Sequence, residues 1–160
     1  MQDLVENLST KLKGLGLMLV TAESCTGGMI AAAMTDRPGS SAVFERGFIT
    51  YSNEAKSELL DVPKDMLMKH GAVSAPVATA MVKGAIAHSR AELAICVTGI
   101  AGPDGGTDAK PVGLVYIGFG DKVGVVEVAE HRFTGDRDSI RKQTVEAALK
   151  HMIKFVDNIA

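Results

Sequence analysis

Apolar and polar positions alternate along this chain in two periods, one typical of helices and one typical of strands. The segment 3–13 repeats leucine every four residues, which predicts an amphipathic helix that ends at the glycines of 14–16. Continuous apolar runs at 17–21 and 93–98 are too short for such helices and predict buried strands. Together these segments predict helices that pack on a buried sheet.

Capping and turn residues place the remaining elements. Ser52 and Ser74 are typical helix N-caps, and Pro76 suits the first turn of a helix. The other predicted elements are helices at 26–34, 53–60, 63–70, 75–90 and 137–156, and strands at 43–51, 112–119 and 123–133.

This order of elements predicts the fold class. Helices interleave with strands early, and a hairpin of two strands comes late, which favours a three-layer α/β/α sandwich on a mixed, mostly parallel sheet. We expect residues 1–160 to form one domain. Ligands of such sheets bind beyond the carboxyl ends of parallel strands, where the segments 23–28 and 99–106 are expected.

Composition narrows the class of protein. The chain is 46% hydrophobic and 22% charged, which argues against disorder, and its formal charge of −2 lacks the basic footprint of a dedicated nucleic-acid binder. Its two cysteines form no disulfide framework, which favours a reducing compartment. No segment has the pattern of a secretory leader or a membrane span. We therefore expect a cytoplasmic protein without a membrane partner.

The segment Thr21-Ala22-Glu23-Ser24-Cys25-Thr26-Gly27-Gly28 is the first candidate site. A hydroxyl leaves a buried strand just before a glycine-opened helix, whose free amides attract an oxyanion or a phosphate. Position alone favours Ser24 as a cap over Ser24 as a nucleophile. Cys25 is a rival nucleophile, although a packing role is the more common one for a buried thiol.

A serine nucleophile needs a base, and no histidine stands in a suitable loop. Lys56, one turn inside its predicted helix, becomes a base if burial lowers its pKa, and Tyr51 at the strand end could converge on the same pocket. The alternative is an exposed lysine beside Glu54 and Glu58. We interpret the histidines as surface or structural residues: His70, His88, His131 and His151.

Three further features could bind a ligand. Thr98 and Gly99 begin a second glycine-rich loop, which is otherwise a wide turn. Arg137 and Arg141 lie four residues apart and could hold a phosphate, or could pair with neighbouring acids. No histidine or cysteine spacing predicts a metal site, and we expect no cofactor.

These segments together resemble the CinA C-terminal domain family. The blocks that carry the resemblance appear in the family's order and cover nearly the whole chain. They are 21–28, Gly47-Phe48-Ile49-Thr50-Tyr51-Ser52-Asn53-Glu54-Ala55-Lys56, His70-Gly71-Ala72-Val73-Ser74, 98–106 with Lys110-Pro111-Val112-Gly113, and Phe133-Thr134-Gly135-Asp136-Arg137.

The resemblance implies a stand-alone nicotinamide-nucleotide amidohydrolase, which converts nicotinamide mononucleotide to nicotinic acid mononucleotide and ammonia. It also implies the same sandwich fold. Under this hypothesis Ser24 attacks the carboxamide, and Lys56, assisted by Tyr51, moves the proton. Amides near Thr26 and Gly27, or near Gly99, stabilise the oxyanion. The candidate contacts to ribose or phosphate are Ser41, Asn53, Thr98 and Arg141.

Two rival functions remain open from sequence. One is a non-catalytic nucleotide-binding module linked to competence or DNA-damage responses, which does not need Lys56 near Ser24. The other is a phosphoryl-transfer enzyme that recruits Glu23, Asp36 and Asp104 for magnesium. The expected partner is a small nucleotide substrate, and the alanine-rich stretch 77–87 leads us to expect a homo-oligomer such as a dimer.

Overall fold

A five-stranded sheet, in the order β2-β1-β3-β4-β5, forms the middle of the molecule. The structure is a computed structural model that describes residues 1–160. Strand β1 pairs in parallel with β2 and β3, whereas β4 runs antiparallel to both of its neighbours, β3 and β5. The sheet is therefore mixed, as predicted. Its strands are β1 (Leu19–Glu23), β2 (Phe44–Ile49), β3 (Leu93–Gly99), β4 (Leu114–Asp121) and β5 (Val126–Arg132).

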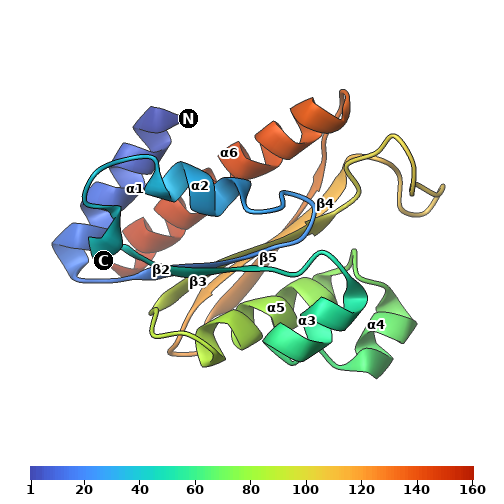
Figure 1. The fold of residues 1–160 in the computed structure, drawn as a ribbon, viewed down its shortest axis with the longest axis horizontal. Coiled ribbons are helices and arrows are strands. Elements are labelled where there is room, and N and C mark those ends of the chain that lie inside the picture. The colour runs from blue at the N-terminus through green and yellow to red at the C-terminus, as the bar shows by residue number, and fades with distance from the viewer.

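Helices cover both faces of this sheet and complete the predicted three layers (Figure 1). One face carries α1 (Gln2–Leu15), α2 (Met29–Thr35) and α6 (Arg137–Ile159). The other carries α3 (Asn53–Leu60), α4 (Lys64–His70) and α5 (Ala75–Ala87). No helix is both long and apolar enough to pass through a bilayer.

Each face of the sheet has its own apolar core. Twenty buried residues join the sheet to the layer of α1, α2 and α6, and twelve join it to the layer of α3, α4 and α5. The stripe predicted on α1 is buried at Leu8 and Leu12, with Val5 beside them. The two predicted N-caps also form, because Ser52 Oγ accepts from the Ala55 amide and Ser74 Oγ from the Val77 amide.

Several predicted boundaries were wrong by two or three residues, and two of them have a clear physical cause. Helix α2 begins at Met29 rather than at Thr26, because Gly27 and Gly28 adopt left-handed backbone conformations with φ of 57° and 104°. Strand β5 begins at Val126 rather than at 123, because the Asp121 carboxylate accepts from the amides of Gly124 and Val125 and closes a longer hairpin turn.

Helices α3 and α5 approach each other closely at Gly84. A Cβ atom on Gly84 would lie 2.0 Å from the carbonyl oxygen of Leu60, the last residue of α3. No side chain fits there, so the glycine sets the spacing between the two helices.

The carboxyl ends of β1, β2 and β3 lie level with one another. Glu23 is paired with Ile49 on one side and with Val97 on the other. The segments that follow these strands therefore leave the sheet together, at the end where α6 begins (Figure 1).

Candidate active site

Ser24 is the first residue beyond β1, and backbone bonds fix it at the sheet edge. Its amide donates to the carbonyl of Val97 on β3 at 3.1 Å. Its own carbonyl accepts from the Gly27 amide at 3.0 Å, which closes the turn into α2. The Ser24 side chain thus stands at the end of a central strand, and the residue is only 8% exposed.

Lys56 reaches Ser24 from the opposite helical layer. Ser52 starts α3, and one turn later Lys56 places its amine under the end of the sheet. The Lys56 Nζ lies 2.9 Å from Ser24 Oγ and donates to the carbonyl of Thr50 at 2.8 Å. Lys56 is 1% exposed. The alternative that the sequence left open, an exposed lysine beside Glu54 and Glu58, is therefore wrong.

The amine of Lys56 has no carboxylate partner. No ion pair forms at this residue. Burial lowers the pKa of the amine, and the charge interaction with Cys25 acts in the opposite direction. Burial without a counter-ion favours the neutral amine, since a charged one would stand unpaired in an apolar surrounding. A neutral amine 2.9 Å from a hydroxyl can accept its proton.

Glu23 fills the amino terminus of α2. Its buried carboxylate accepts from the amides of Ile30 at 2.8 Å and Ala31 at 3.0 Å, and from the hydroxyl of Thr26 at 2.7 Å. The helix start that the sequence offered to a phosphate is therefore occupied by the protein's own acid. Sequence reasoning missed this role because it assumed that the helix begins at Thr26.

Arg141 holds the turn from the other side. Its Nε donates to the carbonyl of Cys25 at 3.0 Å, and its terminal nitrogen donates to the carbonyl of Thr26 at 3.3 Å. The expected phosphate contact thus ties α6 to the Ser24 turn through backbone oxygens. Glu23 and Arg141 together fix the turn on both sides.

A hollow of about 250 Å³ opens beside Ser24. Its walls come from the Ser24 turn, the end of β2, the loop after β3 and the start of α6, and its other polar side chains are Tyr51, Asp104 and Arg137. The Tyr51 hydroxyl accepts from Arg137 at 2.8 Å and makes no bond to Lys56. Arg137 also donates to the carbonyl of Gly102 at 2.7 Å.

The comparisons place the chain among known proteins. The family model for the CinA C-terminal domain matches residues 1–156. The chain belongs to the CinA C-terminal domain family. The CinA-like protein of Citrifermentans bemidjiense is 49% identical over 155 residues, 97% of this chain, although the chain spans only 37% of that longer protein. The nicotinamide-nucleotide amidohydrolase PncC of Escherichia coli is 47% identical over 150 residues, 94% of this chain and 91% of its own length.

Solved CinA-family structures have the same fold. The crystal structure of the competence/damage inducible protein CihA from Agrobacterium tumefaciens has a TM-score of 0.94 and 47% identity, covering 96% of this chain and 93% of that one. The sandwich and its strand order are therefore those of the CinA family.

The other predicted contact residues of this CinA domain lie in different surroundings. Thr98 is buried and donates its hydroxyl to the carbonyl of Ala72 at 2.9 Å, so it anchors the loop before α5. Thr26 is bound to Glu23, whereas Gly99 lines the hollow beside Ser24. Asn53 starts α3 on the exposed side and lines a separate surface depression with residues of α4.

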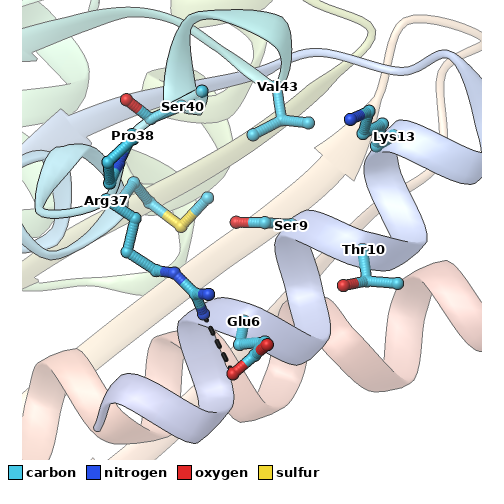
Figure 2. Close-up of a pocket in the computed structure, with 10 residues that line it drawn as sticks. Glu6, Ser9, Thr10, Lys13, Arg37, Pro38, Ser40 and Val43 are labelled. Atoms are coloured by element: carbon cyan, nitrogen blue, oxygen red, sulfur yellow. Dashed lines mark ion pairs between the residues drawn. The ribbon is translucent and has the colours of Figure 1, made fainter.

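Ser41, the remaining predicted contact residue, does not line the hollow beside Ser24, and its contact with the ligand stays a prediction. Ser41 lies in the short 3-10 helix Ser40–Ala42, just before β2, and therefore at the amino ends of the parallel strands. A second hollow of about 220 Å³ lies there, with Ser40, Lys13 and the ion pair of Arg37 with Glu6 on its walls (Figure 2). The full length of β1 separates it from Ser24.

The rival nucleophile and the histidines do not compete with Ser24. Burial raises the pKa of the Cys25 thiol to about 11, so the thiolate is disfavoured at neutral pH. None of the four histidines lines the hollow. The His131 and His151 rings contact each other at 2.8 Å between β5 and α6, and His88 pairs with Asp61.

Proposed function

We propose that this chain is a nicotinamide-nucleotide amidohydrolase that converts nicotinamide mononucleotide to nicotinic acid mononucleotide and ammonia. The observation that carries the mechanism is the 2.9 Å contact between Ser24 Oγ and the uncompensated amine of Lys56. The substrate class follows the PncC relative, which matches this chain over 91% of its own length.

In the first half-reaction, Ser24 Oγ attacks the carboxamide carbon while its proton passes to the neutral Nζ of Lys56. The carbonyl of Thr50 accepts one N–H of that amine and orients its lone pair toward Ser24. The carbon–nitrogen bond then breaks, and the proton on Lys56 moves to the departing amide nitrogen, which leaves as ammonia. An ester between Ser24 and the nicotinoyl group remains.

In the second half-reaction, water attacks this ester carbonyl and gives a proton to Lys56. The ester bond breaks, Ser24 Oγ recovers the proton from Lys56, and the product is released as a carboxylic acid. This acid ionises in water to the carboxylate, and its proton converts ammonia to ammonium. The balance is one carboxamide and one water to one carboxylate and one ammonium ion. Lys56 performs the proton transfers to and from Ser24, the leaving nitrogen and the attacking water.

The developing oxyanion needs free N–H donors close to Ser24. The amides of Cys25 and Thr26 donate to no backbone carbonyl, whereas the amide of Gly27 is used by the Ser24 carbonyl. We assign the oxyanion site to the residues directly after the nucleophile, in place of Gly27. Glu23 and Arg141 hold these amides in position through the contacts described above.

We propose for Tyr51 a role that differs from the expected assistance to Lys56. Its hydroxyl accepts from Arg137, which leaves its own proton free for a ligand in the hollow, and its ring forms part of the wall. We therefore assign Tyr51 to substrate contact, with Lys56 acting on Ser24 alone.

The rival functions have less support. A non-catalytic nucleotide module has no need of a buried lysine against a serine. A magnesium-dependent enzyme would need gathered acids, but Glu23 caps α2, and no three metal-ligating side chains come together.

Ammonia release from nicotinamide mononucleotide tests the proposal. Purified protein should release ammonia and form the acid product, and Ser24→Ala should lose at least about 10³-fold in kcat. Ser40→Ala, in the hollow at the other end of the sheet, is the matched control and should retain full activity. Turnover by Ser24→Ala at the unmodified rate would remove Ser24 from the mechanism.

A further inference from the structure

Two histidine rings meet between the edge strand β5 and helix α6. The Nε2 atoms of His131 and His151 lie 2.8 Å apart, and the two ring planes cross at 63°. Each ring is also stacked on a phenylalanine, His131 on Phe133 at 4.9 Å and His151 on Phe119 at 5.1 Å between ring centroids. Both histidines are half-buried, and the four rings together join β4, β5 and α6.

The 2.8 Å contact limits the number of protons that the pair can hold. A hydrogen bond between two imidazole nitrogens needs one N–H donor and one bare nitrogen as the acceptor, so at least one ring must be neutral. If both rings are protonated, two N–H groups point at each other and two positive charges lie side by side. The contact between β5 and α6 then becomes repulsive.

The surroundings of the pair favour neutral rings. Burial lowers the pKa of both histidines, and the positive charges of His131 and Lys154 lower the pKa of His151 further. Glu127 on β5 acts on the pKa of His151 in the opposite direction, and Phe119 on β4 carries no charge. The remaining charged side chains in the second half of α6 form ion pairs, Lys150 with Glu146 and Asp157 with Lys11 of α1.

Strand β5 has few other neighbours to hold it. It lies at the edge of the sheet and pairs with β4 alone. Phe133, on which His131 stacks, follows β5 and donates its amide to the carbonyl of Gly113 at 2.9 Å. Gly113 in turn donates to the carbonyl of Ile100 at 2.7 Å, which closes the base of the loop beside the Ser24 hollow. Loss of the histidine contact would therefore loosen β5 and the segment that supports this loop.

We propose that His131 and His151 form an acid-sensitive contact, which holds β5 and Phe133 on α6 at neutral pH and releases them when both rings are protonated. The ordinary pKa of histidine is about 6.5. Between the lowered native pKa values and this value, the released form binds more protons than the closed form, so the contact weakens as pH falls. Well above the ordinary value both forms carry neutral rings, and the contact has its full strength.

Amide hydrogen exchange at two pH values tests this proposal. The protection factors, which are corrected for the intrinsic effect of pH on exchange, should be compared at about pH 7.5 and about pH 5, on either side of the ordinary histidine pKa. Those of the β5 amides and of the Phe133 amide should fall at least about 10-fold at the lower pH, because each unit of difference in pKa changes the opening equilibrium up to tenfold.

Variants assign this fall to the histidine pair. The double variant His131→Phe with His151→Phe keeps aromatic rings at both positions but cannot be protonated there, so the fall should be absent. His70→Gln, at an exposed histidine that ends α4, is the matched control and should keep the fall. No fall in the unmodified protein, or an equal fall in the double variant, would overturn the proposal.

A second measurement does not depend on how the double variant folds. In an NMR titration of the ring protons of the unmodified protein, His131 and His151 should be protonated below about pH 6.5 and in two separate steps, because the first charge opposes the second. Titration of both rings at or above the ordinary histidine value would contradict the acid-sensitive contact.

Discussion

The two ends of the sheet carry hollows of nearly equal size, about 250 Å³ beside Ser24 and about 220 Å³ beside Arg37, yet their chemistry differs. At the amino end, Arg37 meets Glu6 at 3.1 Å in solvent, so these two charges compensate each other (Figure 2). At the carboxyl end, Lys56 is buried without any acid. The difference teaches that a buried amine without a counter-ion, rather than the size of a hollow, marks the candidate active site.

The largest expected effect is on catalysis at the carboxyl end. Lys56→Met should lower kcat for ammonia release by at least about 10³-fold, because Ser24 loses its proton acceptor. Binding of nicotinamide mononucleotide, followed by calorimetry, should persist. Lys13→Met in the amino-end hollow is the control and should keep kcat. Equal activity of the Lys56 and Lys13 variants would show that the two ends of the sheet do not differ in catalytic role.

The buried carboxylate of Glu23 should contribute more to the free energy of unfolding than the exposed ion pair at the amino end. Glu23→Ala leaves two helix amides and the Thr26 hydroxyl without their acceptor, which should cost about 3 kcal/mol in free energy of unfolding. Urea denaturation measures this loss, and Glu23→Gln should fall between alanine and the unmodified protein. A loss in free energy of unfolding below about 1 kcal/mol, the contribution of an exposed ion pair, would show that the Glu23 carboxylate does not hold α2.

The lowered pKa of Lys56 has a consequence for stability against pH. Between this lowered pKa and the ordinary lysine value of about 10.4, the unfolded chain binds one proton more than the native chain, so stability rises with pH. Lys56→Met should be more stable than the unmodified protein at neutral pH by about 1 kcal/mol. Urea titrations across this pH range should show the gap narrowing as pH rises, and a constant gap would contradict the lowered pKa.

The smallest effect is expected at the amino end. Arg37→Gln removes an exposed ion pair and should change the free energy of unfolding by less than about 1 kcal/mol. Its kcat should stay at the unmodified value. A large loss of ammonia release in this variant would mean that the amino-end hollow takes part in function.

The fold could be predicted from the sequence because its signals are local. The leucine stripe of α1, the caps at Ser52 and Ser74 and the apolar run of β3 each depend on neighbouring residues. The order of these elements then restricts the architecture, and the CinA-family comparisons confirm it.

The candidate site could be predicted only in part, because its contacts join distant segments. Ser24 and Lys56 are 32 positions apart, and the resemblance to the CinA family brought them together before the structure showed their contact. Spacing put Arg137 and Arg141 on one helix face as equivalent anion contacts. Their targets are instead different, since Arg141 binds carbonyls of the Ser24 turn and Arg137 meets Tyr51.

Gly84 takes no part in the chemistry, yet it controls the reach of Lys56. A methyl group there would collide with Leu60 at the end of α3, the helix that carries the lysine. Because α3 would have to move away from α5, the amine would leave its place beside Ser24. A mutational scan for lost activity would therefore score this glycine like a catalytic residue, although it touches no ligand. Only a chemical-rescue or binding assay would separate such a spacer from the groups that react.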